Sequence, residues 1–188
     1  MQRQKLNPLV AIVSPQYISA LLKIHEKLEG KNIDWAVSGD LAEALKAVRV
    51  EPDCIEIVTS KNGAEQIYSA VSELSPQKVE YRIQQLQRNA LIEEKEYPIY
   101  TRSYYFEFEV DGIKVKVHGD LQFKVGEWDW GDKFEFTPGS VYIVNKKTSL
   151  VPLYTKYELY QSLGWADRAE KITSTLANQQ RLSRHLLK

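Results

Sequence analysis

The chain has 188 residues, of which 43% are hydrophobic, and its 25 acidic side chains balance 25 basic ones. This length and composition fit one folded domain, or one domain with a small appendage. Because the charges balance, no overall field draws the protein to nucleic acid or to an anionic membrane, and we expect neither as a partner.

The single cysteine excludes an internal disulfide framework and fits a reducing compartment. The sequence contains no run of eighteen apolar residues, and its first residues lack the apolar core of a signal peptide. These features predict a soluble, cytoplasmic protein.

The first predicted helix begins at Ser14-Pro15, where a capping hydroxyl precedes a proline in the first turn, and it ends near Gly30. Leucine and isoleucine recur along it at helical spacing, so it is a packing helix. His25 has charged neighbours in this helix and is expected to be a solvated surface residue.

The most informative stretch is residues 35–59. It predicts a short strand ending at Ser38-Gly39, a helix over residues 41–48, and a second strand over residues 54–58 that carries Glu56. A glycine turn before a helix suits an anion, because backbone N–H groups and the positive end of the helix dipole point at the same place. The plainer interpretation, a strand end and a helix cap, stays open.

Strands dominate from Val79 onward, after a further helix predicted over residues 64–74. Residues 100–110 alternate, Asp111-Gly112 predicts a hairpin turn, and residues 113–117 form the returning strand. By the two-residue period of a strand, Lys114, Lys116 and His118 share one face.

This order of elements resembles the nucleotidyltransferase superfamily, whose members move a nucleotide from a nucleoside triphosphate onto a hydroxyl or a phosphate. The resemblance implies a Gly-Ser turn that holds phosphate, two magnesium-binding acids on the second strand, and a third acid on a later strand. In this chain the Ser and Gly of the turn stand in reversed order. If Glu56 is the second acid, the first falls at Cys54; if Asp53 is the first, the second falls at Ile55, so neither register gives a complete pair. The position of the third acid falls at Lys116.

These departures change the expected chemistry, because two-metal phosphoryl transfer needs carboxylates to hold magnesium. We expect Lys116 to form a direct ion pair with Glu56 in the vacated metal site. Lysine still binds phosphate as a point charge. Ser38, Gly39, Lys116 and His118 are therefore the candidate nucleotide-binding residues, and Glu56 is the candidate metal ligand.

The chain after residue 150 resembles the C-terminal helical extension of small, uncharacterised and antibiotic-modifying nucleotidyltransferase-fold proteins. The match covers the Val151-Pro152 lead-in, Leu159 and Gly164; those proteins carry an acidic pair after the glycine, whereas this chain has Arg168 and Lys171 nearby. We expect an α+β fold: a mixed sheet from strands near residues 33–38, 54–59, 100–110 and 113–118, flanked by helices. A nucleotidyltransferase-like domain would span residues 1–150, with a helical extension over residues 151–188 packed on it.

Three functional hypotheses follow. The first is a degenerate nucleotidyltransferase, a pseudoenzyme that keeps at most nucleotide or phosphate binding. The second is an active enzyme that uses magnesium, a nucleoside triphosphate, Glu56 and a displaced acid at Asp120, with Asp129 and Asp132 as further acids in a nearby loop. The third is an antitoxin-like module that binds a protein partner.

Overall fold

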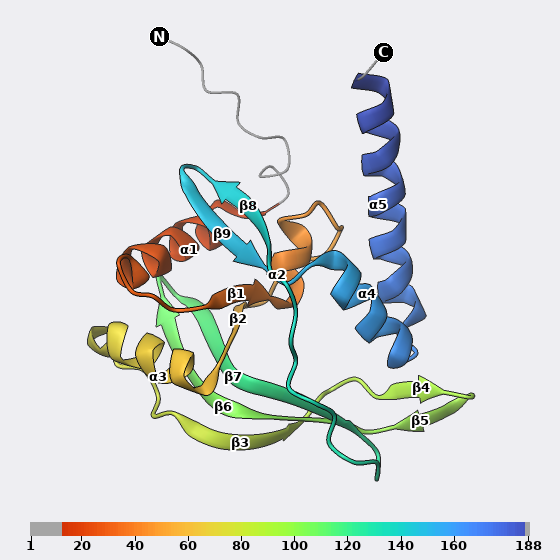
Figure 1. Ribbon diagram of the computed structural model, residues 1–188, viewed down its shortest axis with the longest axis horizontal. Helices are drawn as coiled ribbons and strands as arrows, with labels where there is room; N and C mark the ends of the chain where they lie inside the picture. The colour runs from red at the N-terminus through yellow and green to blue at the C-terminus, as the bar shows by residue number, and fades with distance from the viewer. Residues whose placement is uncertain (1–12, 187–188) are drawn as a thin grey trace.

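The computed structural model describes residues 13–186, which form a mixed sheet with helices packed against it (Figure 1). The helices are α1 (Pro15–Leu28), α2 (Gly39–Ala44), α3 (Lys61–Ala70), α4 (Leu153–Ser162) and α5 (Ala166–Leu186). The strands are β1 (Trp35–Ser38), β2 (Ile55–Thr59), β3 (Glu80–Gln85), β4 (Ala90–Ile92), β5 (Lys95–Tyr97), β6 (Ile99–Val110), β7 (Ile113–Val125), β8 (Gly139–Ile143) and β9 (Lys146–Leu150).

Seven strands make the main sheet in the order β3-β6-β7-β2-β1-β9-β8, and β4 and β5 form a separate hairpin. The pairs β2–β7 and β1–β9 are parallel, whereas the other pairs are antiparallel. The expected α+β class with a mixed sheet is confirmed.

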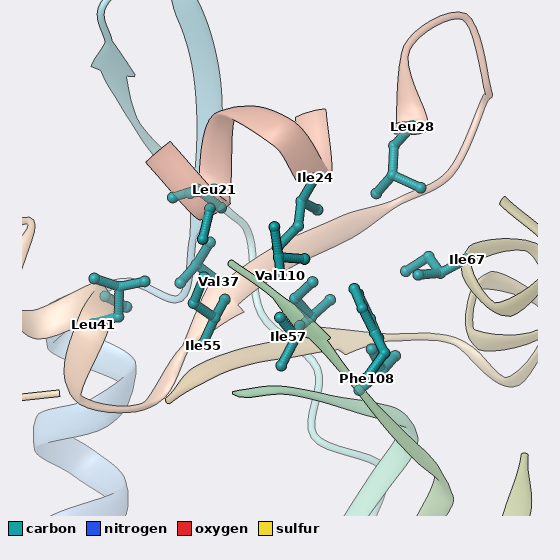
Figure 2. Close-up of a cluster of buried hydrophobic side chains, with 14 of the residues drawn as sticks. Leu21, Ile24, Leu28, Val37, Leu41, Ile55, Ile57, Ile67, Phe108 and Val110 are labelled. Atoms are coloured by element: carbon teal, nitrogen blue, oxygen red, sulfur yellow. The ribbon is translucent and has the colours of Figure 1, made fainter. Parts of the chain in front are cut away.

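The main core lies between one face of this sheet and helices α1 and α3 (Figure 2). Helix α1 contributes Leu21, Ile24 and Leu28, whose spacing of three and four residues places them on one side of the helix. They pack with alternate strand residues, such as Ile55 and Ile57 of β2. The residues between these must point to the opposite face of the sheet, where the candidate site lies.

The helices after β1 and β2 end earlier than expected. Helix α2 ends at Ala44, because Ala47 adopts a positive φ of 68° that no helix can continue through. Helix α3 begins at Lys61 and is followed by a 3-10 turn, Ser72–Leu74. The predicted strands did not include β3, β4, β5 or β9. The sequence of β9, KKTSL, lacks a clear alternation.

The two C-terminal helices lie beside α2, at the end of the sheet away from α1 and α3 (Figure 1). A second apolar cluster joins them to the rest of the chain, with Val48 packed against Leu153, Tyr160 and Ile172. Within residues 13–186, no helix combines the length and hydrophobicity that a bilayer crossing requires.

Candidate functional site

A cavity of about 400 Å³ lies over the sheet face that helices α1 and α3 leave open. Strands β1, β2 and β7 supply its floor, and helices α4 and α5 supply polar side chains to its wall. Its polar lining includes Ser38, Gly39, Asp40, Asp53, Glu56, Lys116, His118, Lys156, Tyr160 and Arg168. The structure thus brings Ser38, Gly39, Glu56, Lys116 and His118 into one cavity.

The Ser38-Gly39 turn closes tightly over Glu56. Gly39 has φ +59°, and a Cβ atom added to it would lie 2.7 Å from Glu56 Oε2. Ser38 and Glu56 are register partners in the antiparallel β1–β2 pair, which explains this closeness. Glycine is therefore required both by the backbone conformation and by the carboxyl group beside it.

The pKa of Glu56 is raised, first because the cavity desolvates its carboxyl group, with Lys156 and Lys116 acting in the opposite direction. The Sγ atom of Cys54, where the resemblance led us to expect the first family acid, lies 4.0 Å from Glu56 Oε1. Burial, with contributions from Asp53 and Glu56, raises the pKa of Cys54 to about 12. Cys54 is therefore a neutral thiol at physiological pH.

Lys116 is the direct register partner of Glu56 in the parallel β2–β7 pair. Burial alone lowers the pKa of Lys116, but its acidic neighbours, among them Glu56 and Asp53, outweigh this effect and the pKa is raised. The side chain thus stays an ammonium.

The expected direct ion pair is wrong, since none of the ion pairs within residues 13–186 joins Glu56 to Lys116. The physical reason is the orientation of the Glu56 carboxyl group, which lies against Gly39.

His118 follows Lys116 on the same face of β7. Burial, with a smaller effect of Lys116, lowers its pKa to about 4, so the imidazole is neutral at physiological pH. Its Nδ1 lies 3.1 Å from Ser103 Oγ, and its ring packs on Tyr105. A neutral ring fixed in this way can offer one hydrogen bond to a ligand.

Asp120 lies apart from the other candidate residues, in a neighbouring cavity of about 690 Å³. Its φ of +52° breaks the alternation of β7 after His118 and turns the side chain away. There Asp120 accepts hydrogen bonds from Lys61 N at 3.1 Å and from Lys133 Nζ at 2.8 Å. This geometry gives no support to a catalytic pair of Glu56 and Asp120.

The structure reveals a buried polar network that the sequence interpretation missed. Glu43 of α2 is fully buried and accepts a hydrogen bond from Lys156 Nζ at 2.6 Å and another from the Tyr160 hydroxyl. Arg168 NH2 lies 2.8 Å from Asp40 Oδ1, and its NH1 lies 3.5 Å from Glu43 Oε2. The only sequence signal was the basic pair after Gly164, where the resembling proteins are acidic.

Lys156 also donates a hydrogen bond to the carbonyl oxygen of Gly39 at 2.5 Å. This bond ties the C-terminal helix α4 directly to the turn over Glu56. This ammonium group is therefore one of the links between the wall of the cavity and the turn at its floor.

These residues do not fit magnesium, which prefers carboxylate oxygens in near-octahedral geometry. Cys54, Glu56 and Lys116, where the resemblance led us to expect the family acids, present a neutral thiol, a carboxyl group whose pKa is raised, and an ammonium group. No cluster of three or more His, Cys, Asp or Glu side chains suited to a metal occurs in the part of the chain that the structure describes.

Comparison with known proteins places the chain near one family and two solved structures. A sequence profile of the aminoglycoside-2''-adenylyltransferase family matches residues 20–171. The crystal structure of a candidate nucleotidyltransferase from Thermotoga maritima is similar, with 27% identity, a TM-score of 0.63, and coverage of 88% of this chain and 96% of that one. ANT(2'')-Ia in complex with adenylyl-2''-tobramycin aligns with 8% identity and a TM-score of 0.47, over 90% of this chain and 95% of that one. No curated protein matches the sequence.

Proposed function

Because the chain belongs to the aminoglycoside-2''-adenylyltransferase family, we propose that it is a nucleotidyltransferase-fold protein that binds a nucleotide or another phosphate compound without magnesium and does not transfer the nucleotide. The family supplies the fold and the class of ligand. The side chains in the cavity argue against metal-assisted transfer.

One observation carries this proposal: Lys116 lies beside Glu56 on the cavity floor, where the family pattern has a metal-binding acid. An ammonium group repels a divalent cation but attracts a phosphate. The Ser38-Gly39 turn lines the same cavity and has the backbone conformation that lets a ligand approach closely. Lys156 is engaged with Glu43 and Arg168 with Asp40, so Lys116 is the cation best placed to meet an anion.

Isothermal titration with ATP tests the proposal, once with magnesium and once with EDTA. We expect the same affinity in both. The Lys116→Ala variant should lose roughly tenfold to a hundredfold in affinity, the usual effect of one charge-assisted contact. Lys114→Ala is the matched control, since Lys114 lies on the same strand and face but outside the cavity.

A magnesium requirement for ATP binding, or nucleotide transfer by the unmodified chain, would overturn the proposal and favour the active enzyme. Absence of binding under both conditions would overturn it as well, and would favour the partner-binding module.

Rebuilding the family acids gives a test in the opposite direction. The double variant Cys54→Asp, Lys116→Asp places one carboxyl group two residues before Glu56, just ahead of β2, and another opposite Glu56 on β7. We expect this variant to bind magnesium, and its ATP affinity to become magnesium-dependent. If the variant folds but ignores the ion, the alignment of these positions with the family acids is wrong.

A further inference from the structure

Strand β3 forms one edge of the main sheet, and its outer side is open. Within residues 13–186 its partner is β6, and no strand pairs with it on the other side. Figure 1 shows β3 at the lower margin of the sheet with no element beyond it. An exposed edge is a template for pairing with another strand.

The backbone groups that β3 leaves free can be identified from the ladder. Leu86 N donates to Ile99 O at 2.8 Å, and residues paired in this way recur at every second position of an antiparallel ladder. Residues 80, 82 and 84 are therefore bonded to β6, whereas the N–H and C=O groups of Tyr81, Ile83 and Gln85 point outward.

The side chains at this edge are unusually apolar for solvent. Tyr81 is 55% exposed and Ile83 is 58% exposed, and both lie on one face of the strand. Tyr81 packs on Tyr104 of β6, with ring centroids 5.2 Å apart, so it extends an aromatic surface to the edge. An edge strand that carried only charged side chains would be better protected against pairing with another chain.

The opposite face of β3 carries one acidic and one basic side chain, Glu80 and Arg82, which can pair with the same residues of a second copy. If two copies of β3 pair antiparallel with a two-fold axis at Tyr81, Glu80 of each copy lies opposite Arg82 of the other. Tyr81 then faces its own counterpart, and Val79 faces Ile83. An axis at Ile83 would instead place Arg82 opposite Gln84 and form no charge pair. The complementarity thus selects one register.

We propose that β3 is the interface of a homodimer, in which a second copy of this chain adds its own β3 antiparallel, with Tyr81 on the two-fold axis. The outward N–H and C=O groups of Tyr81 and Ile83 gain backbone partners in this arrangement. Since Gln84 and Arg88 line the ligand cavity, the second copy lies next to its rim.

Charge reversal tests both the dimer and its register by sedimentation velocity. We expect a species of twice the 21.7 kDa of one chain. Glu80→Arg and Arg82→Glu each place like charges opposite one another twice, and each should raise the dimer dissociation constant about tenfold or more. The double variant restores the opposite charges and should return the constant to within about threefold of the unmodified chain.

Two controls keep the test interpretable. Glu65→Arg makes the same charge change on an exposed site of α3 and should leave the dimer intact. Circular dichroism checks that each variant folds, which matters for Arg82 because its guanidinium stacks over Tyr105 at 4.9 Å.

Ile83→Pro offers a variant with unchanged charge. It removes an outward N–H group that β6 does not use, so it should dissociate the dimer while the chain stays folded. A mass of one chain at every concentration would overturn the proposal. So would a dimer that is indifferent to the single reversals, or a double variant no tighter than the single ones.

Discussion

At the scale of single residues, the site depends on a glycine and on a histidine that stays neutral. At Gly39 the backbone lies close to the carboxyl group of Glu56. His118 is held uncharged beside an ammonium group. For each residue we predict an effect on stability that can be measured without knowing the ligand.

Gly39→Ala should destabilise the protein by about 2 kcal/mol or more, because the new Cβ would collide with Glu56 and the backbone would be strained. Gly112→Ala is the matched control: it has a similar φ of +77° and open space around it. The control should show the backbone strain alone. Urea unfolding measures both, and equal losses would contradict the contact with Glu56.

His118 should make stability depend on pH. Its pKa falls from about 6.5 in the unfolded chain to about 4 in the folded one. Between these pH values the unfolded chain binds a proton at His118 and the folded chain does not. The contribution of His118 to the free energy of unfolding is therefore full above pH 6.5 and decreases as the pH falls toward 4. The loss is at most about 3 kcal/mol, since the cavity is open to solvent.

The replacement His118→Gln should remove this part of the pH dependence, as followed by urea unfolding between pH 7 and pH 4. The variant His25→Gln, which replaces a second histidine in the same way, is compared with it. The pKa of His25 is lowered as well, but His25 is half-buried and bonded to Thr148 at 2.8 Å, not the solvated residue expected from the sequence. A wild-type slope retained in His118→Gln would show that this histidine titrates normally.

At the scale of elements, the polar network around Glu43 joins α2 to α4 and α5. Glu43 and Lys156 are almost fully buried, with side-chain exposures of 0% and 5%. A pair of this kind adds little net stability by itself, but the loss of one partner leaves a buried charge. The network therefore fixes where the C-terminal helices dock, and with them the wall of the cavity.

Lys156→Met should destabilise the protein by about 3 kcal/mol, because Glu43 would lose its ammonium partner inside the protein. The same variant should loosen the Gly39 turn, since the bond to the Gly39 carbonyl goes with it. Lys146→Met, which removes an exposed pair with Glu29, is the control and should change stability little. Thermal unfolding measures both variants.

At the scale of the whole molecule, we propose that residues 1–150 and the extension over residues 151–188 unfold together. Val48 is completely buried and packs against the extension, so removal of the extension would expose it. The two parts also share the Glu43 network.

One cooperative transition should appear in thermal unfolding, at the same temperature by tryptophan fluorescence and by far-ultraviolet circular dichroism. A chain ending at residue 150 should not reach the native fold. Two separate transitions, or a stable shortened chain, would show that the extension is an independent unit.

The fold class and the main elements of the sheet could be predicted from local patterns in the sequence. The alternation over residues 100–110 and the Asp-Gly turn after it are local signals, and they produced the β6–β7 hairpin. The order strand, glycine turn, helix, strand over residues 35–59 is local too, and it indicated the nucleotidyltransferase superfamily.

The contacts within the site could not be predicted in this way, because they depend on the packing of distant segments. The orientation of Glu56 toward Gly39, the separation of Asp120 and the Glu43 network join segments far apart in the chain. Lys156 lies 113 positions from Glu43. No periodicity encodes such a pairing, because a buried ion pair forms only where packing brings its members together and excludes water.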